Sequence, residues 1–326
     1  MILWFLFSCD VASKSYQTVS TIDDSGTPEI GYPFGYPYLL SFHVCNVVES
    51  NCGDPSGHKV HLAGSENGAD WELISDMEPF PSSVPDVHLR DNILYVMGLP
   101  ELQRYNVETG VWMETAYPQV FSGTEPVMHV DPSMFVDEQN RLVLFFMEGF
   151  EGSDPATCPP GESTCTKYFL SATEVPGSLG TAFSLDPGNR MEIVLNEQQR
   201  IAADPDIFIG PDGYYQYVSR GQNTQVFFSD QLRGTYVPID TVNDGLLVMG
   251  GGGVPAGYYH TEDEHFWTFV TTNADEGKTD IRLARHGSLY TPLRFDDFDT
   301  VLSGADAISN DYLVSSPGFF AIEQPE

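Results

Sequence analysis

Short apolar runs alternate with turn-forming residues along nearly the whole chain. The runs are rich in Val, Ile, Tyr and Phe and are bounded by Gly, Pro, Asn and Asp, and no stretch keeps a helical period. This pattern predicts an all-β protein built from many short strands.

Two kinds of segment recur in this pattern. The first kind is a strand led by proline, then a turn, then a strand rich in aromatic residues. Its copies span residues 84–97, 130–146 and 203–218, with a weaker copy at 254–269 and a degenerate one at 305–314. The second kind is an apolar strand, a polar turn and a closing strand, found at residues 61–74, 102–112, 168–174, 226–236 and 281–290.

Alternation of the two kinds gives four strands per unit and five units. A repeat of about 45–50 residues with four strands is typical of propeller blades, which cannot bury their faces alone. The sequence therefore predicts a five-bladed β-propeller over residues 31–326, with a generic β-sandwich as the alternative.

One long interval and one missing strand remain to be explained in the predicted ring. The interval from Asp131 to Asp204 is longer than the others and contains Cys158 and Cys165, which indicates an insertion. The strands expected near residues 38–44 and 59–74 have no proline-led strand before them. We expect residues 305–316 to supply it, so that pairing of the N- and C-terminal strands closes the ring and leaves no open sheet edge.

The cysteines form two pairs with the same spacing, Cys45 with Cys52 and Cys158 with Cys165. Each pair brackets six polar or turn-forming residues, so two local disulfides are the simplest pairing, although crossed pairs remain possible from sequence alone. A zinc site is the alternative, but zinc-binding pairs usually have a shorter spacing. Disulfides predict an oxidising compartment.

The N-terminus agrees with export. The short apolar run that ends in Leu6-Phe7-Ser8-Cys9 resembles a bacterial lipobox, in which the cysteine is lipidated, although no basic segment precedes it. An ordinary apolar start is the alternative. Residues 1–9 are therefore predicted to be a signal segment and residues 10–30 a polar tether. We expect an exported protein, either an envelope lipoprotein or secreted.

Charge narrows the set of partners. The chain has 47 acidic and 14 basic residues, a formal net charge of −33. Such a surface repels nucleic acid and anionic lipid, so no nucleic-acid partner is expected and membrane contact is expected only through a lipid anchor. The protein is also expected to be a monomer. Solvated surface explains most of the excess. A negatively charged substrate channel is the alternative.

One motif resembles a known family. Val130-Asp131-Pro132-Ser133-Met134-Phe135 is similar to the third-blade motif of family 43 glycoside hydrolases, the arabinosidase and xylosidase type with invertase-like relatives. Val84-Pro85-Asp86-Val87 resembles their second-blade motif, and Asp204-Pro205-Asp206 occupies the place of the fourth.

The resemblance implies a five-bladed propeller that cleaves glycans with three channel-facing carboxylates. One acts as base, a second as acid, and a third adjusts the pKa of the acid. Asp131 matches the adjusting position. The acid position falls on Ala203, with Asp204 beside it, and the base position falls at Tyr36-Pro37. Asp131 and Asp204 are therefore candidate catalytic residues. Asp306, a further carboxylate expected on an inner strand, is the third candidate.

Further residues are candidates for substrate binding. They share a place on or near the proline-led strands or in aromatic runs: Asp86, Asp206, His129, His260 and Tyr36. Each also has a structural interpretation, since an aspartate beside proline often orders a turn and an aromatic ring often lies in a blade core. Gly250–Gly253 lacks the helix and lysine of a phosphate loop, and no Gly-x-Ser-x-Gly or His-Glu-x-x-His motif is present.

These observations predict an exported, glycan-active propeller, a glycoside hydrolase for a neutral polysaccharide or oligosaccharide. The alternatives are a propeller that binds carbohydrate or protein without catalysis and a purely structural lipoprotein. No cofactor is required by this chemistry. Ca²⁺ is the candidate for a bound metal.

Overall fold

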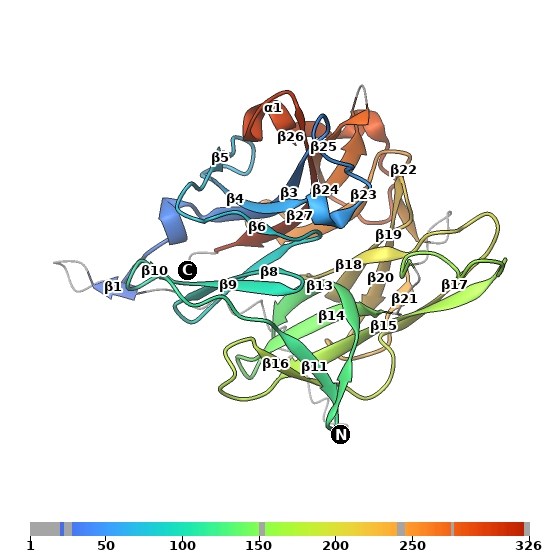
Figure 1. Ribbon diagram of the computed structural model, residues 1–326, viewed down its shortest axis with the longest axis horizontal. Helices are drawn as coiled ribbons and strands as arrows, with labels where there is room; N and C mark the ends of the chain where they lie inside the picture. Colours follow the sequence, from blue (N-terminus) through green and yellow to red (C-terminus); the bar gives the residue numbers. More distant parts are fainter. Residues whose placement is uncertain (1–19, 23–27, 150–153, 240–244, 275–276, 323–326) are drawn as a thin grey trace, which may run out of the picture.

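The computed structural model describes residues 20–22, 28–149, 154–239, 245–274 and 277–322. It is an all-β protein in which larger sheets surround a common centre in a propeller-like arrangement (Figure 1). We number five of these sheets in the order in which the chain completes them, beginning with the one that contains β3. The predicted all-β class and the propeller-like arrangement are confirmed.

Sheets 1 and 2 contain both ends of the described chain. Sheet 1 comprises β27 (Tyr312–Ala321), β3 (Tyr38–Asn46), β4 (Lys59–Ser65), β5 (Glu72–Leu73) and β6 (Phe80–Pro81). Sheet 2 comprises β7 (Asp86–Arg90), β8 (Ile93–Gly98), β9 (Glu101–Asn106) and β10 (Val111–Trp112).

Sheet 3 is the largest and contains the predicted insertion. It comprises β13 (His129–Val136), β14 (Leu142–Glu148), β15 (Cys165–Glu174), β16 (Ala182–Leu185), β17 (Met191–Leu195), β11 (Gln119–Ser122) and β12 (Glu125–Val127). Sheet 4 comprises β18 (Ala203–Gly210), β19 (Gly213–Ser219), β20 (Asn223–Ser229), β21 (Val237–Pro238) and β22 (Leu246–Met249). Sheet 5 comprises β23 (Gly253–His260), β24 (His265–Asn273), β25 (Thr279–His286) and β26 (Asp299–Leu302).

The remaining elements are short. Strands β1 (Ser20–Ile22) and β2 (Pro28–Ile30) pair with each other, within the segment predicted to be a tether. Short helices are η1 (Pro33–Gly35), η2 (Pro55–Gly57), η4 (Phe295–Asp297) and α1 (Gly304–Ala307). Within the described part of the chain, no helix is both long and apolar enough to cross a membrane.

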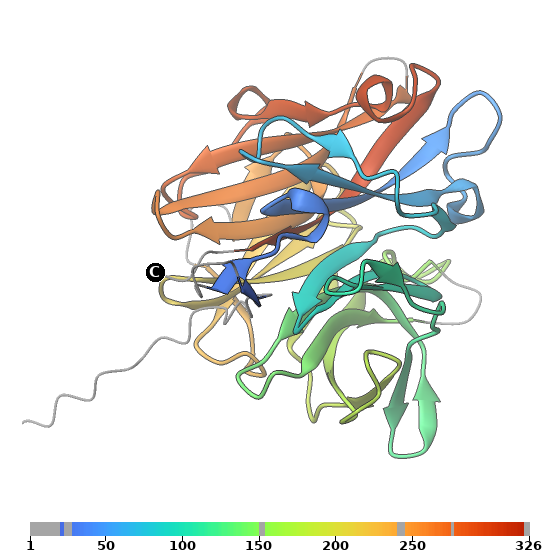
Figure 2. The same ribbon diagram turned by 90° about the vertical axis from the view of Figure 1, so that its left-hand side faces the viewer.

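One strand of each sheet faces the centre. Strands β27, β7, β13, β18 and β23 contact one another in this order, and β23 contacts β27 again, so they form a closed ring. The turned view in Figure 2 shows sheets 3 and 5 on opposite sides of this ring. The prolines at 85, 132, 205 and 255 each mark the beginning of such a strand, as the sequence predicted.

A hydrophobic core lies between each pair of neighbouring sheets. Successive residues on an inner strand point to opposite faces and so enter different cores. On β27, for example, Phe319 packs with sheet 5 and Phe320 packs with sheet 2. This explains why the strands are apolar on both faces, because each sheet is covered on both sides.

The ring is closed by the two ends of the chain, but only the last part of the predicted segment 305–316 belongs to the closing strand. Residues 305–307 belong to α1, and the inner strand β27 begins only at Tyr312 and runs antiparallel to β3. Its proline is Pro317, which the sequence analysis missed. The following Gly318 is required by packing, because a Cβ there would lie 2.6 Å from the carbonyl oxygen of Pro85.

Candidate active site

The same backbone irregularity occurs in every inner strand. The residue before the proline has a positive φ, between 47° and 57°, and four of the five strands shift register at this point. The five residues are Val84, Asp131, Asp204, Val254 and Ser316. Because the inner strands form a ring, these residues occupy equivalent places around one axis.

This conformation is unfavourable for the residues that adopt it. A positive φ is rare outside glycine, and it is rarest for β-branched residues such as Val84 and Val254. Strain of this kind costs about 1–3 kcal/mol per residue and occurs frequently at functional sites. Aspartate tolerates it better, and the two aspartates stand next to each other in the ring.

Asp131 and Asp204 interact directly. The backbone N–H of Asp204 donates a hydrogen bond to the carboxylate of Asp131, and the hydroxyl of Ser219 donates to the carboxylate of Asp204. Both residues are half-buried. The structure thus places Asp131 and Asp204 beside each other, while their role as catalytic residues stays a prediction.

At two other places in the ring, a hydroxyl accepts the hydrogen bond that Asp131 accepts here from the N–H of Asp204. The hydroxyl of Ser219 accepts from the N–H of Val254 at 3.1 Å, and that of Thr271 accepts from the N–H of Ser316 at 2.9 Å. The equivalent place in sheet 3, opposite Val130, holds Met147, which has no hydroxyl. Asp131 itself accepts the corresponding N–H instead.

The two carboxyl groups have unlike proton affinities. Burial raises the pKa of Asp131 to about 6, opposed by the N–H of Asp204 and assisted by the charge of Asp154. Burial also raises the pKa of Asp204 well above its usual range, and the charges of Asp131 and Asp154 raise it further against the effect of Ser219. Of the two carboxyl groups, Asp204 is therefore the one that the charge of its partner pushes further toward the protonated form.

Asp154 is a site residue that sequence reasoning missed. It lies at the start of the disulfide-closed segment, and its charge acts on both members of the pair. Its Oδ1 accepts from the N–H of Ala156 at 2.9 Å, while the carbonyl of Ala156 accepts from the N–H of Ala202 at 3.1 Å. The sequence shows only that Asp154-Pro155 lies within the predicted insertion, which does not indicate its approach to the pair.

Asp86 and Asp206 join neighbouring inner strands. Asp86 accepts hydrogen bonds from the N–H groups of Val87 and Met134. Asp206 accepts from the N–H of Gly257 at 2.7 Å and from the hydroxyl of Ser133. These contacts use both oxygens of each carboxylate for the architecture, whereas we had predicted substrate binding.

Asp306 is not on an inner strand, so its predicted place at the centre is wrong. It lies on α1, is exposed, and accepts from the N–H of Ser303 at 3.0 Å as part of a capping box. Tyr36 is likewise not at the inner position of sheet 1, because β27 lies there and presents Ser316. The hydroxyl of Tyr36 donates to Glu72 at 2.7 Å beside the outer strands.

The two histidines lie in different surroundings. His129 is on β13, two residues before Asp131, and its Nε2 is buried without a hydrogen-bond partner. Burial lowers its pKa. His260 stacks on Trp267, with ring centroids 5.2 Å apart, and bonds to the hydroxyl of Tyr38 at 3.2 Å, at the core between sheets 5 and 1.

Cysteines and metal ligands complete the comparison with the sequence. The disulfides Cys45–Cys52 and Cys158–Cys165 are formed as predicted. Cys9 lies outside the described residues. Among the described residues, no three His, Cys, Asp or Glu side chains are grouped to hold a metal ion, and Ca²⁺ stays a prediction.

The fold of this chain is similar to several solved structures of glycoside hydrolases. The RS223 β-xylosidase matches with a TM-score of 0.52 and 12% identity over 79% of this chain and 91% of that one. A GH43 β-xylosidase/α-arabinofuranosidase from a compost microbial metagenome, solved with xylotriose, matches with a TM-score of 0.56 and 12% identity over 79% and 90%. The fold is that of the family 43 glycoside hydrolases. A GH43_1 enzyme from Xanthomonas citri, with xylotriose, also matches, with a TM-score of 0.50 and 14% identity over 81% and 93%.

The family 43 likeness is one of fold. No protein-family model matches the sequence, and no curated protein matches it either. The motif resemblance expected the acid at Ala203, which is buried, and the base at Tyr36, but the inner strand of sheet 1 is β27, which presents Ser316. We refer to Asp131 and Asp204 together as the acid pair.

Proposed function

We propose that this protein is an exported, glycan-active propeller that hydrolyses a neutral glycosidic bond at Asp131 and Asp204. The observation that carries the proposal is the coupling of Asp131 and Asp204 in a fold like that of family 43: the backbone N–H of Asp204 bonds to the carboxylate of Asp131, and the charge of Asp131 raises the pKa of Asp204. Glycosidases need this combination, because one carboxyl group must donate a proton while the other is ionised.

The proposed step follows from the proton affinities. Asp204 donates its proton to the glycosidic oxygen as the bond between that oxygen and the anomeric carbon breaks. Asp131, ionised above pH about 6, removes a proton from a water whose oxygen bonds to the anomeric carbon. The step leaves Asp131 protonated and Asp204 ionised, and transfer of the proton back to Asp204 restores the starting state.

Architecture and location are part of the proposal. The five sheets correspond to five blades, supported by the closed ring of inner strands and by one core between each pair of neighbours. Two disulfides support an oxidising compartment outside the cytoplasm. Lipidation at Cys9 and a monomeric state remain our predictions from sequence.

Hydrolysis of aryl xylosides, aryl arabinofuranosides and the corresponding oligosaccharides tests the function. We expect Asp131→Asn and Asp204→Asn each to lower kcat by about 10²–10⁴-fold, the usual contribution of a general acid or base. Asp230→Asn, an exposed residue of the same sheet region, is the matched control and should retain full activity. Turnover that survives in both site variants contradicts the assignment.

The pH dependence of kcat gives a second readout. The rate should rise with pH through about 6 as Asp131 ionises, and fall at higher pH as Asp204 loses its proton. The residual rate of Asp204→Asn should show no alkaline decline.

One observation favours the alternative, a propeller that binds glycan without cleaving it. Ala203 stands where the family 43 resemblance expects the acid, and neither Tyr36, where it expects the base, nor Ser316 on the inner strand of the same sheet is a carboxylate. In that case oligosaccharides bind to the wild type and to Asp131→Asn alike, and no reducing ends are released.

A further inference from the structure

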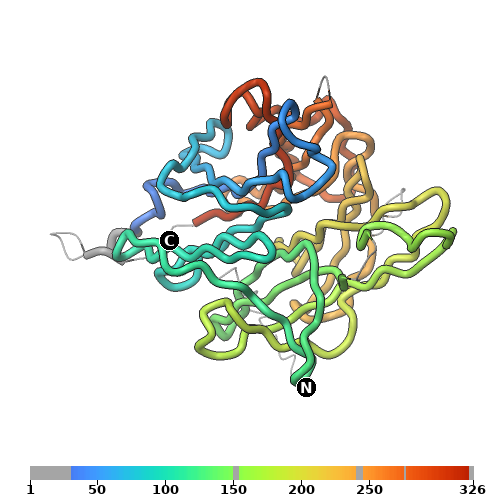
Figure 3. The backbone as a smooth tube through the Cα atoms, in the orientation of Figure 1, coloured from blue at the N-terminus to red at the C-terminus, as the bar shows by residue number. Residues whose placement is uncertain are grey.

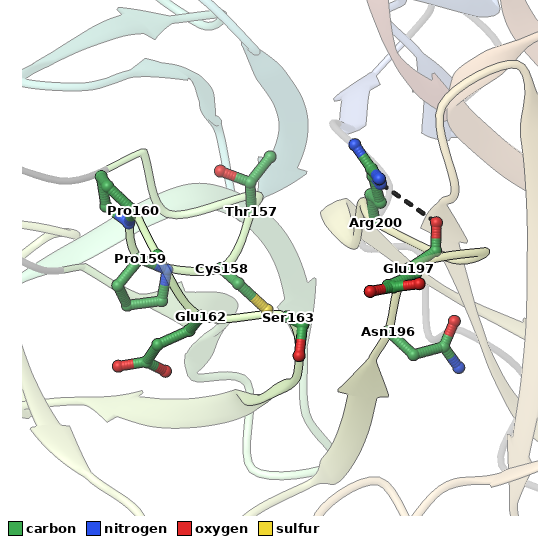
Figure 4. Close-up of a pocket in the computed structure, with 10 residues that line it drawn as sticks. Thr157, Cys158, Pro159, Pro160, Glu162, Ser163, Asn196, Glu197 and Arg200 are labelled. Carbon is green, nitrogen blue, oxygen red and sulfur yellow. Dashed lines mark hydrogen bonds between the residues drawn. The ribbon is translucent and has the colours of Figure 1, made fainter.

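A pocket lies between two segments. The first is the disulfide-closed segment, which contains the Cys158–Cys165 disulfide, and the second is residues 196–202, which lead into β18. The volume of the pocket is about 390 Å³, and it is lined by residues 157–163 of the first segment and by Asn196, Glu197 and Arg200 of the second. Figure 4 shows Glu197 and Arg200 facing Thr157 and Cys158 across the pocket. This volume is within the range of small-molecule sites in proteins.

Strand pairing places this pocket at the same end of the sheets as the acid pair. His129, at the start of β13, pairs with Glu148 at the end of β14, and the disulfide-closed segment follows β14. Cys165, at the start of β15, pairs with Leu195 at the end of β17, and the second segment follows β17 and ends at β18. Figure 3 shows the two segments together at one edge of the molecule.

Packing joins the pocket wall to the acid pair. Ala156 and Cys158 belong to the same hydrophobic cluster as Val130 and Ala203, which are the neighbours of Asp131 and Asp204. The bond from the N–H of Ala202 to the carbonyl of Ala156 fixes the wall at this point. The pocket wall is therefore packed against the strands that carry Asp131 and Asp204.

The wall is held in place before any ligand binds. The Cys158–Cys165 disulfide closes it, and Glu162 donates its N–H to the carbonyl of Pro159 at 3.0 Å. The ammonium group of the buried Lys167 lies near the carboxylates of Asp154 and Glu162 beneath it. A preorganised wall lowers the entropic cost of binding.

The lining chemistry identifies the ligand class. Hydroxyls of Thr157 and Ser163, carboxylates of Glu162 and Glu197, and the guanidinium of Arg200 provide both acceptors and donors. Their formal charges sum to one negative, within a protein of net charge −33, which opposes an anionic ligand. A neutral, hydroxyl-rich ligand matches this mixture.

We propose that this pocket is a subsite for a neutral sugar unit of the glycan chain whose cleaved bond lies at Asp131 and Asp204. The inference rests on the proposed function for the location of the cleaved bond, and it adds a preference for longer chains. The subsite is made by the segment inserted into sheet 3, so it is a feature of this chain and not of the repeated blade.

Chain-length dependence of binding tests the subsite. The protein carries Asp131→Asn and Asp204→Asn to prevent turnover, and it is titrated by calorimetry with xylose, xylotriose, xylohexaose and the matching arabinose series. Against this background, Glu197→Ala and the occluding Ser163→Trp should weaken hexasaccharide binding about tenfold, equivalent to about 1.4 kcal/mol, and leave binding of the monosaccharide unchanged. Glu108→Ala, an exposed acid on sheet 2, is the matched control.

The outcomes separate this proposal from the proposed function. Pocket-dependent binding of long chains supports the subsite even where the wild type releases no reducing ends, a result that would refute only hydrolysis. Equal weakening at every chain length, or none, overturns the subsite while hydrolysis by the wild type still stands. Preference for a uronic acid or an amino sugar oligomer over the neutral series also overturns it.

Discussion

At the scale of single residues, the ring repeats one backbone conformation and varies the side chain. Val84, Asp131, Asp204, Val254 and Ser316 share a positive φ before proline, yet only two of them are acidic. The fold therefore supplies the place, and the two aspartates supply the chemistry. Because valine and serine occupy the other places, little polar environment remains to stabilise a second negative charge.

The raised pKa values have a consequence for stability. A carboxyl group whose folded-state pKa lies above its unfolded value favours the folded state at low pH, and this advantage is lost as pH rises through the folded-state pKa. For Asp131, the loss falls between pH about 4 and about 6. Asparagine retains a hydrogen-bond acceptor at this place without acquiring a charge.

Asp131→Asn should therefore stabilise the protein at pH 7 and have little effect at pH 4. We expect a gain of about 1–2 kcal/mol in the free energy of unfolding, less than the full shift implies because the residue is half-buried and partly screened. Urea unfolding at both pH values measures it, with Asp230→Asn as the control. An equal change at pH 4 and pH 7 would refute the raised pKa.

At the scale of elements, the inner strands are joined by a repeated hydrogen bond. The side chain after the proline accepts a hydrogen bond from an N–H group on the next inner strand. Asp86 accepts from Met134, Ser133 accepts from Ile207, and Asp206 accepts from Gly257. Sheet 5 has Ala256 at this place and sheet 1 has Gly318, so the series is incomplete. The aspartates of this series are thus part of the architecture.

Removing one member of this series should loosen one junction. Asp206→Ala leaves the buried N–H of Gly257 without its acceptor, and we expect a loss of about 2–3 kcal/mol in stability. Ser133→Ala should cost less, about 1–2 kcal/mol, because its hydroxyl is neutral. Thermal unfolding measures both, and Asp230→Ala is the exposed control. Equal stability of Asp206→Ala and the control would contradict this role.

Elements were more predictable from sequence than the site they build. Proline-led strands, both disulfides and the insertion are local patterns, and each was predicted from neighbouring residues. Ser316-Pro317-Gly318 escaped because its proline precedes a glycine that packing demands and the expected copy lay earlier. Asp154 escaped because its approach to Asp131 depends on how the inserted segment folds back, which no local pattern encodes.

At the scale of the whole molecule, the pairing of strands that closes the ring is opposed by repulsion between like charges. The ring is completed by β27 pairing with β3, strands from opposite ends of the described chain, so the compact state depends on distant contacts. The net charge of −33 lies on this compact body and repels itself. Added salt shortens the range of that repulsion, from about 30 Å at 0.01 M to about 3 Å at 1 M.

Salt should therefore raise the thermal stability of this protein. The midpoint of unfolding at pH 7 should increase steadily as NaCl rises from roughly 10 mM to 1 M, since screening relieves the folded state more than the expanded unfolded chain. A variant with the exposed Glu49, Glu108 and Glu138 all replaced by lysine reduces the negative charge by six and contacts neither the acid pair nor the pocket. It should melt higher than the wild type at low salt and respond less to added NaCl. A midpoint that falls with salt, or a variant with the wild-type salt response, would show that short-range contacts and not the overall charge set the stability of the ring.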